Sequence, residues 1–172
     1  AGCKSSRPGD LAVQLLTLSA EAGVSPSASA RAEIDQVVDL AKQRARGKTG
    51  HELVEALNLL IFDELGFERE VEHDSLEFML LPHVVAHRRG SCLGLAALYL
   101  VMAERVGLEV KGVLVPRHFF LRYQQRNIEL LREGEAMPDE WYIQKWQVPA
   151  SATAYLRPLS DKEALAVFRF NL

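Results

Sequence analysis

Cysteine is scarce in this chain of 172 residues, which contains only Cys3 and Cys92. Two cysteines cannot build the disulfide framework that holds small secreted domains together. The chain also lacks a long apolar run, because its longest, 93–103, is far shorter than the roughly 20 residues of a membrane-spanning helix. The remaining composition, with 48% hydrophobic and 25% charged residues, is typical of a globular domain that buries its own core.

Neither sign of charge is in large excess, since 20 Lys and Arg stand against 23 Asp and Glu, for a net charge of −3. Domains that bind nucleic acids through a basic face need clustered positive charge. Aromatic residues make up only 8% of the chain, which argues against a surface on which bases stack. We therefore expect no nucleic-acid partner.

The first residues, Ala1-Gly2-Cys3, resemble the end of a bacterial lipobox, and the polar stretch that follows has the composition of a tether. On this interpretation residues 1–9 form a flexible N-terminal tether, and a lipidated Cys3 attaches the protein to a membrane surface. The expected location is then the bacterial cell envelope, on the periplasmic or outer surface. If the tripeptide occurs by chance, the expected location is the cytoplasm.

The first half of the chain has the apolar periodicity of helices. Apolar residues recur at helical spacing in 11–22, 28–45 and 51–65, and glycine follows each segment. The stretch 67–73 is charged and lacks this period, which predicts a loop. Pro82 lies inside the next helical segment and is expected to kink or split it.

The most informative helix begins at a serine. Ser91 is a good N-cap, and residues 93–103 are apolar on nearly every face of a helix. Gly107 closes the segment. A helix that is apolar all round is buried, so the sequence predicts a central helix with Cys92 at its N-terminus.

The period changes after residue 108, where short apolar runs predict strands. We expect strands at 110–115 and 119–121, a hairpin loop at 124–126 and a returning strand at 127–131. Helices followed by a few antiparallel strands and a last helix make an α+β domain. In this domain the buried central helix packs on a small antiparallel sheet and is preceded by a helical N-terminal part.

The C-terminal segment 160–172 begins with a capping box formed by Ser160 and Glu163, and it carries no stop signal. It is expected either to dock on the domain or to start a following helical repeat region. We expect residues 10–172 to form a single domain that includes this helix.

Cys92 is the first candidate for chemistry. It is expected at the first helical position after Ser91, where unsatisfied N–H groups and the positive end of the helix dipole stabilise a thiolate. The backbone N–H groups around Ser91 and Cys92 can also hold a developing oxyanion. On position alone, an inert, half-buried cysteine is the more frequent case.

His118 is the candidate for the base that a cysteine nucleophile needs, and a base needs a partner that orients it. Glu129 and Asn127 are the two candidates for that partner. Alternate residues of a strand share a face, so a turn of two or four residues places Glu129 on the face of His118, and a turn of three does not. Asn127 has the same parity as Glu129, which leaves both open.

A rival grouping of His83, His87 and Cys92 suggests a metal site, because two histidines four residues apart on a helix can share an ion. A glutamate between the histidines, a second cysteine and a further acidic ligand are missing nearby. We therefore expect no metal.

Trp141, Tyr142 and Trp146 form an aromatic cluster that can wall a peptide-binding cleft or close a core, and the second use is the more frequent one. The arginine series that begins at Arg117 is interpreted as a solvated strand face.

Several spaced motifs resemble one family over about residues 50–147. They are Leu57-Asn58 with Phe62–Phe67, Arg88–Leu95 with Leu98–Leu100 and Ala103–Leu108, Gly112-Val113, Pro116–Phe119, and Asn127–Glu129 followed by Gly134. These motifs resemble a bacterial transglutaminase-like group. The resemblance implies a core similar to that of papain-type cysteine proteases, often followed by tetratricopeptide repeats.

In that superfamily a cysteine at a helix N-terminus, a histidine on one strand and an aspartate on the next form the catalytic triad. The resemblance therefore implies that Cys92 is the nucleophile, His118 the base and Glu129 the orienting carboxylate. Glu129 stands in place of the usual aspartate, which keeps Asn127 as the alternative third member. Arg117 stands where many relatives have glycine and is expected to narrow the cleft.

The function implied by the resemblance is cysteine acyl transfer on peptide-type amide bonds, by hydrolysis or by transfer, with no metal or organic cofactor. The expected substrate or partner is a peptide or protein, and the expected cleft includes Arg117, Trp141 and Trp146. Many relatives lack the cysteine. The alternative function is therefore a catalytically silent interaction or scaffold module with the same fold.

Overall fold

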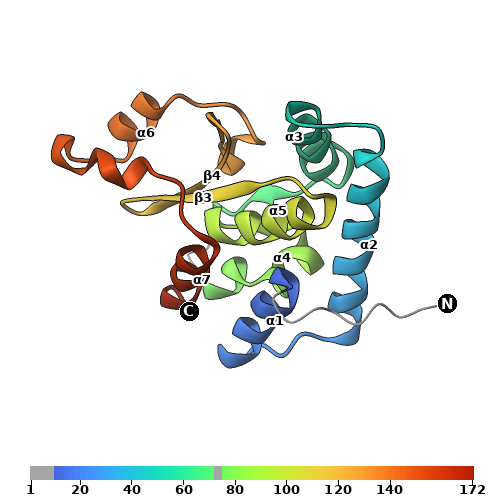
Figure 1. Cartoon of the computed structure of the whole chain (residues 1–172). Coiled ribbons are helices and arrows are strands. Elements are labelled where there is room, and N and C mark those ends of the chain that lie inside the picture. The colour runs from blue at the N-terminus through green and yellow to red at the C-terminus, as the bar shows by residue number, and fades with distance from the viewer. Residues whose placement is uncertain (1–9, 72–74) are drawn as a thin grey trace.

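The computed structural model describes residues 10–71 and 75–172, and it has one central helix between a helical layer and a small sheet (Figure 1). The central helix is α5 (Cys92–Val106), which packs against helices on one side and strands on the other. The helical layer consists of α1 (Leu11–Glu21), α2 (Ala28–Ala45), α3 (His51–Asn58) and α4 (Leu81–His87). Residues 1–9, with the expected tether and the expected lipidation site Cys3, lie outside the described residues.

All of residues 93–103 in α5 are buried, as expected for a helix that is apolar on every face. Ser91 caps the helix, because its Oγ accepts a hydrogen bond from the Gly94 N–H. Gly107 ends the helix in the left-handed region, with a φ of 74°. The prediction of a buried central helix is confirmed.

The start of α5 is held against a 3₁₀ turn, η2 (Leu76–Met79). The Ser91 N–H donates to the Phe78 carbonyl at 2.9 Å. A Cβ atom at Gly94 would lie only 2.0 Å from that carbonyl oxygen. Glycine at this position therefore lets the two backbones approach, which fixes the chain on both sides of Cys92.

Three antiparallel strands cover the other side of α5. They are β3 (Val110–Val115), β4 (His118–Tyr123) and β5 (Arg126–Ile128), in the order β3-β4-β5. In β4, Phe119 and Leu121 pack with the core around α5, whereas Phe120 packs in a second apolar cluster on the opposite face. That second face is covered by α6 (Asp139–Lys145) and the 3₁₀ segment η4 (Ala150–Leu156).

Several segments differ from the sequence-based expectation. The helix expected at 51–65 has a regular first part, α3, and a wider π-helical second part, η1 (Leu59–Glu64). The loop expected at 67–73 contains a two-residue strand, β1 (Glu68–Arg69), which pairs in parallel with β2 (Arg89–Gly90). A strand of two residues is too short to leave an alternating pattern in the sequence.

Two other segments follow the expectation in part. Pro82 splits its helical segment, because α4 begins only after η2 has ended. The strand expected at 127–131 ends early, and the chain turns into the 3₁₀ segment η3 (Leu130–Arg132). Glu129 therefore lies just beyond the strand rather than inside it.

The last helix, α7 (Asp161–Phe170), docks on the domain, which is one of the two expectations for this segment. Ser160 and Glu163 form the expected capping box. Phe168 is buried in the main core. The architecture is the expected α+β arrangement of helices around a small antiparallel sheet. Within the described ranges, no helix is both long and apolar enough to span a bilayer.

Candidate active site

Cys92 is the first residue of α5, and its side chain is half-buried. This position places the thiol at the positive end of the helix dipole, beside first-turn N–H groups that have no acceptor within the helix. Such N–H groups can hold an oxyanion that forms next to the sulfur. The backbone around Cys92 therefore suits a nucleophile.

His118 begins β4, immediately after a tight turn. Pro116 and Arg117 form this two-residue turn, which pairs Val115 with His118. Proline suits the first turn position because its φ is fixed, and the second position, Arg117, has a positive φ of 60°. A residue other than glycine in this region is strained by about 1 kcal/mol. The turn directs the histidine inward, where only 1% of its side chain is exposed.

The next turn brings Glu129 to the same face of the sheet. Gln124 and Gln125 form a two-residue turn, because Tyr123 pairs with Arg126. Because side chains alternate between the two faces of a sheet, a turn with an even number of residues places Glu129 on the same face as His118. Register in this hairpin therefore decides which side chain reaches the imidazole.

Glu129 holds the imidazole of His118 in place. His118 Nε2 donates to Glu129 Oε2 at 2.7 Å, and each side chain is 1% exposed. The Leu131 N–H donates to the other carboxylate oxygen at 3.0 Å. Because both oxygens of Glu129 are engaged, the carboxylate and the ring have fixed orientations.

Asn127, the alternative partner of His118, is hydrogen-bonded elsewhere. Its Oδ1 accepts from Arg122 Nε at 2.6 Å, and its amide donates to the Met137 carbonyl at 2.8 Å and to Asp139 Oδ1 at 2.7 Å. Arg122 also pairs with Asp139 at 2.6 Å. Asn127 therefore belongs to a network that ties the β4–β5 hairpin to α6.

The pKa of His118 is raised from its ordinary value to about 9. Burial alone would lower this pKa, but the interactions with Cys92 and Glu129 outweigh that effect. Nδ1 of the ring is buried and has no hydrogen-bond partner among the described residues. Since Glu129 occupies Nε2, Nδ1 is the ring nitrogen left for the thiol. At neutral pH the ring is thus an imidazolium beside a carboxylate.

Aromatic rings close the site on the side of α6. Trp146 stacks on His118, with the ring centroids 4.4 Å apart and the planes inclined by 10°. Burial, and after it the charge of Glu129, raises the pKa of Tyr142 above its usual range, so this phenol stays neutral. From the sequence, Trp141 and Trp146 are expected in the cleft. In the structure, both side chains pack in the second apolar cluster with Tyr142.

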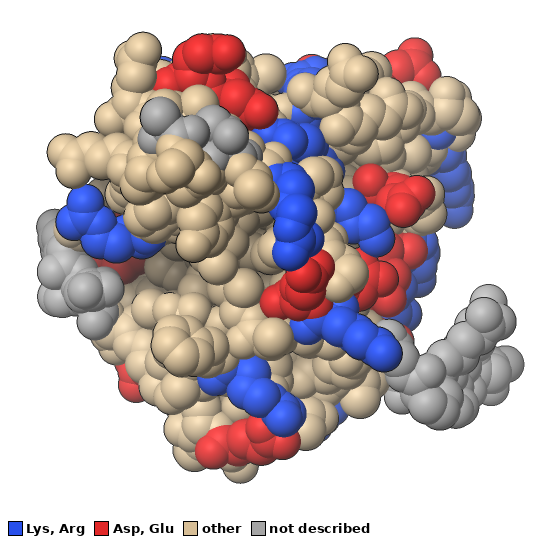
Figure 2. Space-filling model, turned by 60° about the vertical axis from the view of Figure 1, so that its left-hand side comes forward, with Lys and Arg blue, Asp and Glu red and all other residues tan. Residues whose placement is uncertain are grey.

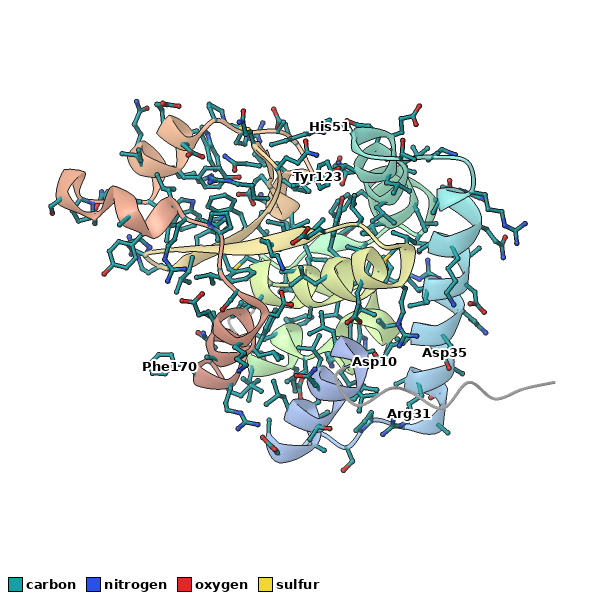
Figure 3. The ribbon with its side chains drawn as sticks, in the orientation of Figure 1. Asp10, Arg31, Asp35, His51, Tyr123 and Phe170 are labelled. Carbon is teal, nitrogen blue, oxygen red and sulfur yellow. The ribbon has the colours of Figure 1, made fainter. Side chains whose placement is uncertain are left out.

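An open cleft of about 790 Å³ gives access to Cys92 and His118. Arg117 lines it from the β3–β4 turn, and Phe170 lines it from α7, from which it projects in Figure 3. This side of the molecule is turned forward in Figure 2, where Lys and Arg are interspersed with Asp and Glu. Helix α7 is not among the segments expected in the cleft from the sequence. No local sequence pattern indicates this contact, because it arises from packing between distant segments.

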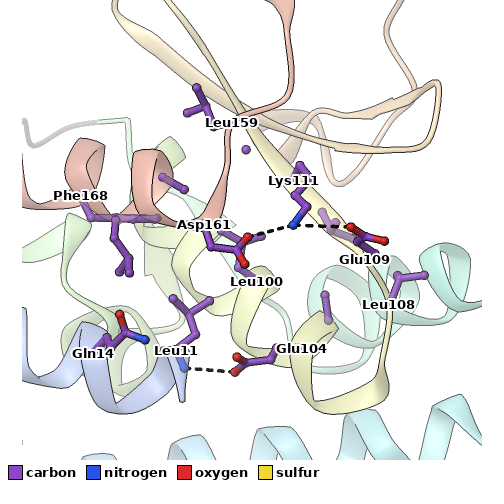
Figure 4. A pocket seen from close by; sticks show the side chains of 15 residues that line it. Leu11, Gln14, Leu100, Glu104, Leu108, Glu109, Lys111, Leu159, Asp161 and Phe168 are labelled. Carbon is purple, nitrogen blue, oxygen red and sulfur yellow. Dashed lines mark hydrogen bonds and ion pairs between the residues drawn. The ribbon is translucent and has the colours of Figure 1, made fainter. Parts of the chain in front are cut away.

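A second cavity of about 190 Å³ lies among α1, α5, β3 and α7 (Figure 4). Lys111 pairs with Asp161 at 2.9 Å, and Glu104 accepts a hydrogen bond from the Leu11 N–H at 3.2 Å. Burial raises the pKa of Glu104. The residues that line this second cavity are different from those that line the Cys92 cleft. The charged groups in the second cavity are paired with other protein groups.

The rival metal grouping does not come together. His83 and His87 lie side by side on α4, with ring centroids 4.1 Å apart, and burial and the neighbouring His87 lower the pKa of His83. Across residues 10–71 and 75–172, no group of three or more His, Cys, Asp or Glu side chains is placed to hold a metal ion. Cys92 therefore does not complete a metal site with this histidine pair.

Comparison with known proteins adds a family. The family model described as the transglutaminase-like superfamily matches residues 28–166. F-box only protein 21 from Homo sapiens and that from Pongo abelii are each 25% identical to the chain over 117 residues, which cover 55% of this chain and 19% of theirs. The chain thus spans about a fifth of the length of these curated relatives. No solved structure matches the chain.

The family match covers most of the chain, from the start of α2 into α7. It includes the helix that begins at Cys92, the strand that begins at His118, and Glu129. The chain belongs to the transglutaminase-like superfamily.

Proposed function

We propose that this domain is a cysteine acyltransferase acting on peptide-type amide bonds, with Cys92 as nucleophile, His118 as base and Glu129 as orienting residue. The observation that carries the proposal is the buried 2.7 Å hydrogen bond between His118 and Glu129, at a histidine that borders the same cleft as Cys92. A nucleophile, a base and a group that orients the base are the parts that covalent catalysis requires.

In the first step, Nδ1 of His118 takes the proton of the Cys92 thiol, and the resulting thiolate attacks the amide carbonyl of the substrate to form a carbon–sulfur bond. First-turn N–H groups of α5 hold the oxyanion that develops on the carbonyl oxygen. His118 gives its proton to the leaving amine, the carbon–nitrogen bond breaks, and a thioester remains on Cys92. Glu129 keeps the ring oriented and stabilises the imidazolium.

In the second step, a water molecule or an amine attacks the thioester. His118 takes a proton from this nucleophile, and the sulfur of Cys92 leaves as the thiolate. Water gives hydrolysis, and an amine gives transfer or cross-linking. The same three side chains serve both outcomes, so the outcome depends on which nucleophile reaches the cleft.

The test is the acylation of Cys92 by p-nitrophenyl acetate, in protein whose Cys3 has been replaced by serine. We expect a burst of p-nitrophenolate and a thioester on the peptide that contains Cys92, detected by mass spectrometry. The acylation rate should exceed that of the urea-unfolded protein by about 100-fold, the lower range for a positioned base.

Cys92→Ser is the matched control, and it should remove the burst while leaving the circular dichroism spectrum unchanged. If the folded protein is acylated no faster than the unfolded chain, the proposal is wrong. The domain would then be the silent interaction module that keeps the fold without the chemistry.

A further inference from the structure

The cleft around Cys92 is lined mainly by apolar and neutral polar side chains, and the charge of His118 is already balanced by Glu129. Its described lining includes no Asp or Glu, and Arg117 is the one Lys or Arg side chain in it. Apolar groups such as Leu114 and Val167 form much of the remaining wall. A ligand complementary to this lining has an apolar part and one negative charge.

Arg117 differs from the neighbouring arginines of the same sheet. Arg122 is paired with Asp139 at 2.6 Å, and Arg126 is paired with Glu55 at 2.5 Å. Within residues 10–71 and 75–172, the guanidinium of Arg117 has no ion pair or hydrogen bond, and its side chain is exposed. Arg122 and Arg126 therefore stabilise the scaffold, whereas the guanidinium of Arg117 is available to a ligand.

Arg117 is one of five residues other than glycine in the described ranges that have a positive φ. Its φ of 60° lies in the region that glycine occupies without strain. Glycine at this position would satisfy the turn after Pro116 equally well. Strained residues other than glycine cluster at sites where the side chain has a function.

Two exposed aromatic side chains flank the same cleft. Phe170 is 89% exposed and Tyr155 is 57% exposed, and both line the cleft. Figure 3 shows Phe170 projecting from α7 away from the core. Large apolar side chains exposed together at the edge of a site provide a surface for an apolar group of a ligand.

We propose that the cleft selects acyl donors that carry a carboxylate side chain next to a large apolar side chain. The carboxylate pairs with Arg117, whose planar fork matches the two oxygens, and the apolar group lies against Tyr155 and Phe170. This inference rests on the proposed function, which places the reacting carbonyl at Cys92. Arg117 is then a specificity-determining residue and takes no part in proton transfer.

The test uses N-chloroacetyl dipeptide amides that carry glutamate-phenylalanine, lysine-phenylalanine or glutamate-alanine. The thiolate of Cys92 displaces chloride from these probes, so that a carbon–sulfur bond forms as the carbon–chlorine bond breaks. Each second-order alkylation rate, measured with Cys3→Ser protein, is divided by the rate of the same variant with iodoacetamide. This normalised rate reports recognition of the probe separately from reactivity of the thiol.

We expect the normalised rate for the glutamate-phenylalanine probe to exceed that for the lysine-phenylalanine probe by about fivefold, a factor that a well-placed exposed ion pair can supply. Arg117→Gly, which relieves the turn, should bring this ratio close to unity, and Arg117→Glu should invert it. Arg46→Ala is the matched control, because it removes one exposed positive charge just after α2, on the opposite side of the molecule in Figure 1.

Phe170→Ala tests the apolar half of the proposal. This substitution should reduce the preference for the glutamate-phenylalanine probe over the glutamate-alanine probe by about threefold, because it removes part of the apolar contact surface. The side chain is exposed, so the thermal unfolding midpoint should not change.

Equal normalised rates for the glutamate and lysine probes with wild-type protein would overturn the proposal. A preference that persists in Arg117→Gly would also overturn it. A wild-type iodoacetamide rate no higher than that of unfolded protein would instead contradict the proposed function, so the two failures can be told apart.

Discussion

Strand β4 carries two polar clusters on one face, one near each end, and they differ in how completely they are hydrogen-bonded. Near its end, Arg122 donates to Asn127, to Asp139 and to a backbone carbonyl, at 2.6, 2.6 and 2.7 Å. At its start, His118 donates to Glu129 at 2.7 Å but keeps a buried ring nitrogen with no partner among the described residues. A buried polar atom left open is costly and is typical of a functional site. We therefore interpret the Arg122 cluster as scaffold and the His118 cluster as the site.

The largest expected difference between the two clusters is in the reactivity of Cys92. His118→Gln, which can still donate a hydrogen bond to Glu129, should lower the rate of iodoacetamide alkylation at pH 7 by about 100-fold, because the thiolate loses its imidazolium partner. Arg122→Ala should stay within about twofold of the wild-type rate, because it lies outside the site. The measurement follows loss of the free thiol in Cys3→Ser protein, and equal losses in both variants would remove the distinction.

For the free energy of unfolding, we expect the larger effect at the Arg122 cluster and the smaller effect at Cys92. Arg122→Ala should lower the free energy of unfolding by about 3 kcal/mol, because Asn127 Oδ1 loses its donor and Asp139 loses one of its two donors in a partly buried network. Cys92→Ala, which removes the thiol next to the His118 cluster, should change the free energy of unfolding by less than about 1 kcal/mol. Urea denaturation of the two variants measures both values. A Cys92→Ala loss as large as that of Arg122→Ala would make the thiol part of the scaffold.

The pH dependence of stability separates the clusters more finely. The pKa of His118 is about 9 in the folded chain, against 6.5 for the free side chain. Its protonated form therefore stabilises the fold fully below pH 6.5, and this contribution is lost as the pH rises through 9. We expect the free energy of unfolding of the wild-type protein to fall by about 3 kcal/mol over that range.

Matched variants assign this slope to one cluster. Arg122→Ala should retain the slope, because an arginine side chain does not titrate between pH 6.5 and 9. His118→Gln should abolish it, because the titrating group is gone. Urea denaturation at pH 6 and at pH 9.5 measures the difference, and a flat wild-type profile would contradict the raised pKa of His118.

Much of the site is predictable because it follows from local patterns. A serine cap before an apolar segment predicts the buried helix and places Cys92 at its start. Strand parity predicts that Glu129 shares the face of His118, provided that the turn between the strands has an even number of residues. The chain satisfies that condition with two residues, Gln124 and Gln125.

Other features of the site depend on contacts between segments that are distant in the sequence. Parity does not separate Glu129 from Asn127, and the distinction arises because Arg122 and Asp139 engage the amide of Asn127. The stacking of Trp146 on His118 depends in the same way on how α6 packs across the sheet. Neither contact leaves a periodic or local signal in the sequence, so only the tertiary structure reveals them.

The most direct test asks whether His118 and Glu129 act on Cys92 as one unit. The rate of Cys92 acylation by p-nitrophenyl acetate is measured in wild-type protein, His118→Gln, Glu129→Gln and the double variant. Glu129→Gln alone should cost about tenfold, and the double variant should be no slower than His118→Gln, because a residue that acts only through the ring has no effect once the ring is gone. If the two losses multiply instead, the two residues act independently and the assignment of Glu129 as the orienting residue is wrong.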